Sequence, residues 1–544
     1  MVKDTSSTSL VIANEESIKP QKDHQKCDQD QSTSDASYSS HLTISGYIKE
    51  IEVTFDNQDP YNPHCWSNKK KVVNLGAAIF SAFSVTFSSA LISQSSEGIQ
   101  EEFAIGEVVA TLATTSLFLL GYAMGPMVWG PVSELYGRKP VMFVSALGHT
   151  LFTFASATAK DIQTLQITRF FAGLTGGAPL VVVPAIMTDI CSASTRGTAI
   201  GIYSIVLFGG PTLSPIISGF TVKNESLGWR WPLYFSGILA ALSFVLIFFL
   251  EETNPSIVLV LKAAKLRLKT KNWGFFAQHE REVQNLSTGA LVEKYITRPV
   301  KMLTSEIVLI LITIYNSFIY GVLYLTLSAE PFAYGMKYGW TQGVREIPFI
   351  AVSLGSILGG IICILFENDY VRLMERNNGK PIPEARLKPM MFGGILFSGG
   401  LFWFFWSANY PAHVHWLVPT FALGVTGCGV VTVFLPCLNY IIDCYALYAA
   451  SALAANTFCR SAFGSVFPLF AGIMLRNIHL NWTGTVLGGF AALLVPVPFL
   501  FYRFGDGLRR RSKMSYHPDP KPTEQRSGSL LSTIAAIFGY DANK

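Results

Sequence analysis

The sequence predicts an all-α membrane protein in which twelve transmembrane helices form two six-helix bundles. Half of the 544 residues are hydrophobic and only 14% are charged, whereas soluble domains carry about 25% charged residues. The apolar runs are continuous, as in SFVLIFFL at 243–250, and do not alternate as the strands of a membrane barrel do. A polar stretch at 251–304 leaves six such runs on either side.

Each run is close to the length of about 20 residues that a membrane-spanning helix needs. The predicted spans are 72–95, 108–131, 140–159, 164–187, 198–220, 231–250, 306–328, 346–366, 389–408, 416–438, 449–472 and 484–503. We expect bundles at 66–250 and 305–505, a cytosolic linker at 251–304, and cytosolic tails at 1–65 and 506–544. The first tail is rich in Ser, Asp, Gln and Lys, so it is expected to be disordered.

The distribution of basic residues predicts the orientation. Cytosolic loops carry an excess of Lys and Arg. If the amino terminus is cytosolic, most basic residues fall in inner segments and few in outer loops, so both termini are placed in the cytosol. Asn224 and Asn481 begin sequons in predicted outer loops, where glycosylation can occur. The linker stretch VLKAAKLRLKTK at 260–271 either lies along the inner membrane surface or forms a solvated helix.

Several chemical classes lack their signatures. The eight cysteines include no C-x-x-C pair, which argues against a zinc site and a disulfide framework. The strings H-E-x-x-H, G-x-S-x-G and G-x-x-x-x-G-K-[ST] are missing from the sequence. We therefore expect no enzyme, no ATP-driven pump, no metal, no cofactor and no nucleic-acid partner. The amino terminus has no apolar region typical of a cleavable signal peptide.

The turn GPVSELYGRKP at 130–140 lies between two predicted spans. Gly130, Glu134, Gly137, Arg138 and Lys139 place an acid and two bases in a tight hairpin at a membrane face. We interpret this hairpin as a conformational latch, in which Glu134 and Arg138 exchange partners between two arrangements. The alternative is an ordinary charged loop.

Two other spans contain polar or helix-bending residues at membrane depth. Span four holds Arg169, and an ionisable residue inside a membrane is a functional candidate by default; the alternative is that it only bonds backbone carbonyls. Span five carries small residues and prolines, which permit close helix packing and kinks. These are Gly201, Gly210, Pro211, Pro215 and Gly219.

The predicted substrate cavity is apolar and aromatic. Tyr315, Asn316, Tyr320 and Tyr324 recur along span seven, and Asn456 and Arg460 are four residues apart on one face of span eleven. Aromatic rings suit flat hydrophobic compounds and, through cation–π contact, amines. The alternative for each ring is packing between helices or against lipid.

The predicted proton carrier is less well defined, because the middle of every span lacks Asp and Glu. The candidates are Glu330 at the outer end of span seven, Asp443 between spans ten and eleven, and His149 in span three. A further candidate is a group whose pKa is set by Arg169 or Arg460. Asp443 is equally explained as a cytosolic loop acid.

These strings resemble the fungal twelve-span drug:proton antiporters of the major facilitator superfamily. The turn at 130–140 is similar to G-x-x-x-D-x-x-G-R-K, with Glu134 for Asp. The string beginning at Arg169 resembles R-x-x-x-G, which the family links to proton coupling. Span five resembles the antiporter motif G-x8-G-x3-G-P-x2-G-G, although Ser214 and Ser218 replace glycines. Further similar strings are DPYNPHCWS, GWRWPLYFSGI, EETNP, PEARL, LNYIIDCY and ASALAANTFCRSAFGSVFPLF, so that the resemblance covers 55–505.

The resemblance implies an exporter that uses protons to expel azole, cycloheximide or polyamine-type compounds by alternating access. It implies a small-molecule substrate, protons and the lipid bilayer as partners, with the plasma membrane as location and the vacuolar membrane as alternative. We expect a monomer. Two alternative hypotheses are a polyamine or nutrient carrier of the same fold, for which inward transport is also open, and a membrane receptor or enzyme.

Overall fold

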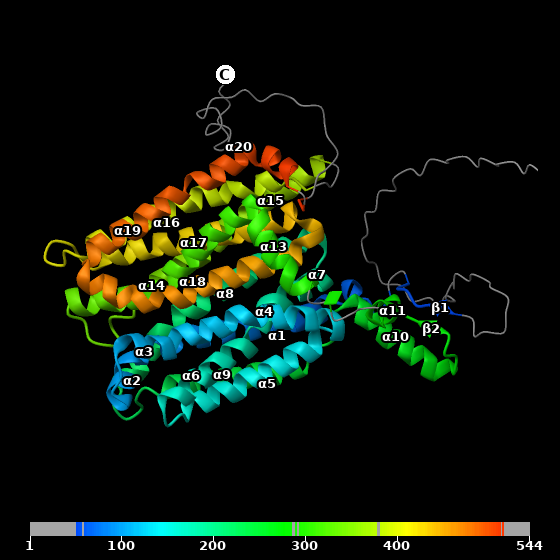
Figure 1. Ribbon diagram of the computed structural model, residues 1–544, viewed down its shortest axis with the longest axis horizontal. Helices are drawn as coiled ribbons and strands as arrows, with labels where there is room; N and C mark the ends of the chain where they lie inside the picture. Colours follow the sequence, from blue (N-terminus) through cyan, green and yellow to red (C-terminus); the bar gives the residue numbers. More distant parts are fainter. Residues whose placement is uncertain are drawn as a thin grey trace, which may run out of the picture. The chain divides into compact units, whose positions relative to one another are not determined.

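The computed structural model describes residues 50–56, 59–284, 289–290, 293–377, 381–512 and 514–515. Most of the predicted tails, at 1–49 and 516–544, lies outside these residues. In the described part, twelve helical segments are long and apolar enough to cross a membrane. Figure 1 shows the blue and cyan helices of the first half beside the green to red helices of the second half. The predicted fold class is confirmed.

Most helical segments of the first half continue beyond the apolar stretches that predicted them, whereas α5 and α9 end two residues earlier than predicted. Span four is broken, because Pro179 lies in the first turn of the second piece and cannot donate to the preceding helix. The elements are α1 (Asn68–Leu91), η2 (Ile92–Ser95), α2 (Ser96–Phe103), α3 (Glu107–Thr111), π-helical η3 (Leu112–Ser116), α4 (Leu117–Tyr136), α5 (Arg138–Ala157), α6 (Ile162–Gly176), α7 (Ala178–Ile190), α8 (Ala193–Lys223) and α9 (Trp231–Phe248).

The second half has the same order of spans. Its elements are α14 (Ile307–Phe332), π-helical η5 (Ala333–Lys337), α15 (Phe349–Arg376), η6 (Pro383–Leu387), α16 (Lys388–Ala408), α17 (Leu417–Cys444), η7 (Ala446–Tyr448), α18 (Ala449–Asn477), α19 (Leu480–Leu494) and α20 (Pro496–Arg511). Large apolar side chains such as Phe248, Leu354 and Leu493 remain exposed on the outside of the bundle. Lipid covers such a surface in a membrane protein.

The linker is folded and holds part of the segment that precedes the first span. It contains α10 (Pro255–Thr270), β2 (Phe275–Phe276), α11 (Gln278–Gln284), π-helical η4 (Glu293–Thr297) and α13 (Arg298–Ser305). Strand β1 (Ile51–Glu52) pairs in parallel with β2, with Ile51 opposite Phe275. The short helix η1 (Pro63–Cys65) follows β1. These residues differ from the predicted disordered tail, because the apolar face of α10 covers them.

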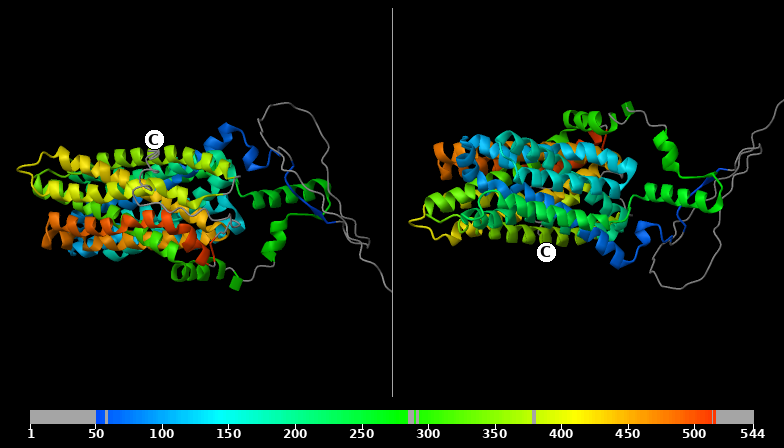
Figure 2. Two further views of the ribbon diagram at one scale, coloured as in Figure 1. Left: turned by 90° about the horizontal axis from the view of Figure 1, so that it is seen from above. Right: turned by 90° about the horizontal axis from the view of Figure 1, so that it is seen from below.

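The two ends of the helix bundle are distinguished by their loops. We call the end that carries the linker, Gly137 and Lys388 the linker end, and the end that carries 104–106, 224–230 and 338–348 the far end (Figure 2). The halves meet where α8 packs along α15 and α4 packs along α18. Thr212 and Ser353 share a hydrogen bond of 2.7 Å across this boundary, and Ser465 donates to the Ser116 carbonyl at 2.9 Å.

Candidate functional site

A cavity of about 490 Å³ lies between the halves at the far end. It is bounded by η2, α2, η3, α14 and the carboxyl-terminal part of α18. Its lining combines apolar groups with charged ones, among them Glu97, Glu107, Thr114, Leu327, Lys337 and Arg476. We call this cavity the vestibule. Of the residues predicted to line the substrate cavity, Tyr324 lines the vestibule.

Tyr324 forms the inner floor of the vestibule. Its hydroxyl shares a hydrogen bond of 2.7 Å with Ser89 of α1, so the floor joins the two halves. Gln94 strengthens the same boundary, because its side-chain amide donates to the Leu327 carbonyl at 3.2 Å. Opening a path deeper into the molecule therefore requires these two bonds to break.

Arg460 lies one layer below this floor. The ring of Tyr320 is 5.1 Å from that of Tyr324, and the Arg460 guanidinium lies 5.0 Å from Tyr320 and 4.8 Å from Phe434. Arg460 is 2% exposed. Its Nε and Nη1 have no acceptor among the described residues, so the side chain is a buried cation without a counter-ion there.

The other predicted cavity residues lie inside the second half. The side-chain amide of Asn316 donates to the side-chain Oδ1 of Asn456 at 2.9 Å, and the Asn456 Nδ2 donates to Thr313 Oγ1 at 3.3 Å. These bonds join α14 to α18. The Tyr315 hydroxyl points toward Gly394 of α16, so this ring packs inside the bundle and not along the vestibule.

Arg169 is fully buried in the first half and bonds backbone carbonyls. It donates to the Thr114 carbonyl at 2.6 Å and to the Ser88 carbonyl at 3.4 Å, and it lies 4.4 Å from the Phe118 ring. Thr114 belongs to η3, where the π-helical pattern alters the hydrogen-bond ladder. Because Thr114 also lines the vestibule, Arg169 holds one of its walls in place.

Two buried carboxylates lie at the far end. Glu330 of α14 is fully buried, and neither of its oxygens has a donor among the described residues. Its neighbours Pro331 and Phe332 line the vestibule. Glu346 accepts from the Gly343 backbone at 2.7 Å and from Arg345 at 2.9 Å. Burial raises the pKa of the Glu346 carboxyl, although Arg345 acts in the opposite direction.

The glycines of α8 bring this helix close to its neighbours. A Cβ on Gly201 would lie 2.8 Å from Ile364 of α15, and one on Gly219 would lie 2.6 Å from the Glu346 carboxylate. A Cβ on Gly210 would overlap Thr86 of α1. Pro211 and Pro215 lie within the continuous helix α8. The small residues of α8 thus allow the close packing that the sequence predicted, and the structure adds the partners, which are α1 of the first half and α15 of the second half.

We expect Gly219→Ala to lower the transport rate and the thermal stability. The new methyl group would displace Glu346 or α8, and overpacking typically costs about 1–3 kcal/mol. Gly209→Ala is the matched control, because a Cβ there meets nothing within 4 Å. Melting temperature in detergent and transport in liposomes measure both variants. Equal behaviour of the two variants would show that the contact with Glu346 is unimportant.

The predicted latch residues occupy the linker end. Arg138 pairs with Asp189 of α7 at 3.2 Å and donates to Ser133 at 2.8 Å. Glu252 accepts from the backbone of Arg138 at 2.9 Å and of Lys139 at 3.1 Å, so a carboxylate caps α5 where the helix dipole favours it. Sequence reasoning missed Asp189 and Glu252, because both are distant in the chain.

Glu134 and the glycines of the turn have separate roles. Glu134 pairs with Lys294 of the linker at 2.9 Å, which connects the first half to the linker. Gly137 has φ +102°, and a Cβ there would overlap the Glu252 carboxylate. Gly130 is less constrained, because a Cβ would lie 3.8 Å from Val181.

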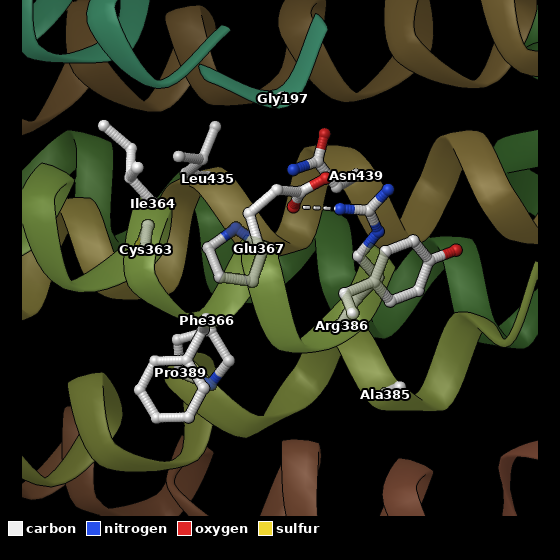
Figure 3. Close-up of a pocket in the computed structure, with 12 residues that line it drawn as sticks. Gly197, Cys363, Ile364, Phe366, Glu367, Ala385, Arg386, Pro389, Leu435 and Asn439 are labelled. Carbon is white, nitrogen blue, oxygen red and sulfur yellow. Dashed lines mark hydrogen bonds and ion pairs between the residues drawn. The ribbon is translucent and has the colours of Figure 1, made fainter. Parts of the chain in front are cut away.

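The second half repeats the charged cluster at the linker end. Arg386 of η6 donates to Asp443 at 3.0 Å and pairs with Glu367 of α15, as Figure 3 shows for Glu367 and Arg386. The Tyr370 hydroxyl donates to Asp443 at 2.7 Å. Asp443 is thus held in an ion pair. Gly197 of α8, in the first half, packs against the Glu367 side chain, because a Cβ on Gly197 would lie 2.6 Å from it.

We expect Arg138→Ala to destabilise the protein and to slow transport. Removing Arg138 leaves Asp189, whose side chain is 11% exposed, without its cation, and losing a charged hydrogen bond typically costs about 1–3 kcal/mol. Asp189→Ala and the double variant complete a thermodynamic cycle. Unchanged transport rate and conformational bias in Arg138→Ala would rule out a latch.

The two sequons differ in their surroundings. Asn224 is exposed at the end of α8 and accepts from Ser226 at 2.7 Å. Asn481 lies in the first turn of α19 and not in a loop, and Thr483 of its sequon is fully buried. The helix begins earlier than predicted because Asn481 and Thr483 lower the hydropathy of its first turn.

Comparison with known proteins gives three findings. The family model described as Major Facilitator Superfamily matches residues 77–468. The chain is 51% identical over 466 residues to the multidrug transporter FLU1 of Candida albicans, covering 85% of this chain and 76% of that protein. It is 45% identical over 470 residues to the multidrug transporter TPO1_2 of Candida glabrata, covering 86% and 80%.

Solved structures agree with the fold. A partially occluded inward-open structure of the xylose transporter XylE from E. coli matches with a TM-score of 0.56 and 16% identity, covering 80% of this chain and 99% of that chain. Another XylE structure, bound to 6-bromo-6-deoxy-D-glucose, matches with a TM-score of 0.58 and 14% identity, covering 81% and 96%. At these identities the likeness concerns the fold alone.

Proposed function

Because this chain belongs to the Major Facilitator Superfamily, we propose that it is a proton-coupled multidrug exporter that works by alternating access between its two halves. Family and fold make it a multi-pass membrane transporter of small molecules, not an enzyme. The observation that carries the proposal is the vestibule between the halves. At its floor, Tyr324 of the second half shares a hydrogen bond with Ser89 of the first half. Such a boundary can break on one side while the other side closes.

We place the linker end and both termini in the cytosol, because basic residues concentrate there. The vestibule then faces outward, which suits the release of a compound on the far side. The plasma membrane is the proposed location, with the vacuolar membrane as the alternative. A monomer suffices, since the halves of one chain form the vestibule.

Small hydrophobic compounds are the proposed cargo. Two relatives named multidrug transporters are 51% and 45% identical to this chain over the aligned residues. The vestibule volume of about 490 Å³ falls in the range of about 300–1,000 Å³ that is typical of drug-sized sites. Tyr324 at the floor, with Tyr320 and Phe434 below it, offers flat apolar surfaces. Azoles and cycloheximide are the compounds to test first.

Glu330 is the proposed proton carrier. An ionised carboxylate buried without a partner is costly, so Glu330 fits this conformation in its protonated form. Because Pro331 and Phe332 beside it line the vestibule, a movement of α14 would expose the carboxyl to water, where it ionises. Asp443 is a weaker candidate, since Arg386 pairs with it at 3.0 Å.

Transport into liposomes tests the proposal. When the liposome lumen is acidic, an antiporter lets protons leave the lumen in exchange for substrate that enters it. Radiolabelled cycloheximide should therefore accumulate in the lumen against its own concentration gradient. A neutral compound is needed, because weak bases accumulate in acid without a carrier. An ionophore that collapses the pH gradient should abolish accumulation. Failure to move cycloheximide, an azole or any polyamine under any gradient would contradict an exporter and favour a receptor.

A further inference from the structure

Arg460 occupies the place where the two halves meet at mid-depth. It lies in the middle part of α18 (Ala449–Asn477), below the vestibule floor. Tyr320 and Phe434 of the second half flank it at 5.0 and 4.8 Å. Tyr122 of α4 and Tyr203 of α8 approach from the first half, close enough for electrostatic interaction. The guanidinium thus lies among aromatic side chains directly below the vestibule floor, where a compound that moved inward past Tyr324 would meet it.

The surroundings of Arg460 leave its charge uncompensated. The side chain is 2% exposed, and its Nε and Nη1 lack acceptors among the described residues. No Asp or Glu of the described residues forms an ion pair with it at 4 Å or less. A guanidinium keeps its charge in proteins, and aromatic faces compensate for only part of the lost hydration. The group is therefore poised to bind an anionic oxygen.

Arg169 is a buried arginine of the same molecule whose two terminal nitrogens both have backbone acceptors, although its Nε, like that of Arg460, lacks one among the described residues. It is also fully buried, yet it donates to the carbonyls of Thr114 and Ser88. Arg460 has no such carbonyl partner among the residues that the structure describes. This contrast distinguishes a side chain that stabilises a wall from one that is free to meet a ligand.

We propose that Arg460 binds the carboxylate, or a similar oxyanion, of an otherwise hydrophobic substrate, so that aromatic and aliphatic weak acids form a substrate class of this transporter. The assignment rests on the proposed function and specifies its cargo. The planar guanidinium can donate two parallel hydrogen bonds to a carboxylate, while Tyr320, Tyr324 and Phe434 cover the apolar body. Polyamines are disfavoured, because a polycation would meet Arg460 without an opposing carboxylate.

Three ligands with one ring system test this assignment: 2-naphthoate, 2-naphthamide and 2-naphthylmethylamine. Binding to the purified full chain is measured by calorimetry, and exchange in liposomes is measured at pH 7.5 on both sides, so that no gradient drives accumulation. The wild-type protein should bind the acid most tightly. Arg460→Gln should weaken binding of the acid about tenfold to hundredfold and leave that of the amide within about twofold.

Two further variants make the result interpretable. Arg460→Lys keeps the charge but loses the paired donors, so it should retain part of the preference for the acid. Arg372→Gln makes the same chemical change as Arg460→Gln on an arginine whose side chain is 75% exposed, and it should behave as the wild type. If Arg460→Gln does not fold, Arg460→Lys still reports on the preference.

The outcomes separate the two proposals. Two outcomes would overturn the role of Arg460 while leaving an exporter intact. In the first, the wild type binds and exchanges the amide and the amine but not the acid. In the second, Arg460→Gln still prefers the acid. Exchange of none of the three probes, together with no transport of cycloheximide or an azole, would overturn the proposed function itself. Loss of the acid alone in Arg460→Gln supports the assignment.

Discussion

Glu330→Gln is expected to reduce pH-driven transport to the level of empty liposomes while leaving substrate exchange at equal pH close to that of the wild type. Glutamine has the shape of a protonated glutamate but cannot release a proton. The folded state should change little, within about 1 kcal/mol, because a neutral group replaces a neutral group. Cycloheximide accumulation under a pH gradient, exchange at equal pH and melting temperature measure these three quantities.

The pattern of the three measurements identifies the role of Glu330. Glu375→Gln is the matched control, since Glu375 is exposed on α15 at the linker end and should leave all three unchanged. If Glu330→Gln loses both exchange at equal pH and accumulation under a pH gradient, Glu330 has a structural role. Full accumulation in Glu330→Gln would show that another group carries the proton, and Asp443→Asn would be the next variant to measure.

Gly137→Ala is expected to lower stability more than any other substitution in the turn at 130–140. At φ +102° only glycine is comfortable, and backbone strain of this kind costs about 1–3 kcal/mol. The added Cβ would also overlap Glu252 and push its carboxylate away from the first backbone N–H groups of α5. Yield and melting temperature of the purified protein should both fall, and transport should fall with them.

Two other glycines separate strain from overlap. Gly228 also has a positive φ, of +71°, but a Cβ there meets nothing within 4 Å, so Gly228→Ala reports on strain alone. Gly76 lies in α1 with nothing within 4 Å, and Gly76→Ala should be neutral or slightly stabilising. If Gly137→Ala costs no more than Gly228→Ala, the contact with Glu252 contributes nothing to the stability of the turn.

The predicted spans show how much hydropathy alone could establish. Every predicted apolar run corresponds to a helical segment long enough to cross a membrane, because a helix in lipid must cover itself with apolar side chains over a fixed length. Boundaries were less accurate, as at α2 and α19, where polar residues continue the helix. The turn at 130–140 was also identifiable, because its glycines and charges form one continuous string.

The sequence by itself therefore determined the fold class, the number and order of the spans, and the location of one charged turn. The tertiary structure alone decided the partners of the polar groups. Arg138 pairs with Asp189, 51 residues away in the chain, Asp443 pairs with Arg386, and Arg169 bonds backbone carbonyls. Glu330 and the Nε and Nη1 of Arg460 have no partner among the described residues. The reason is physical. Helices that are apolar on all sides give no sign of which face meets protein and which meets lipid, so only their packing fixes which polar groups meet.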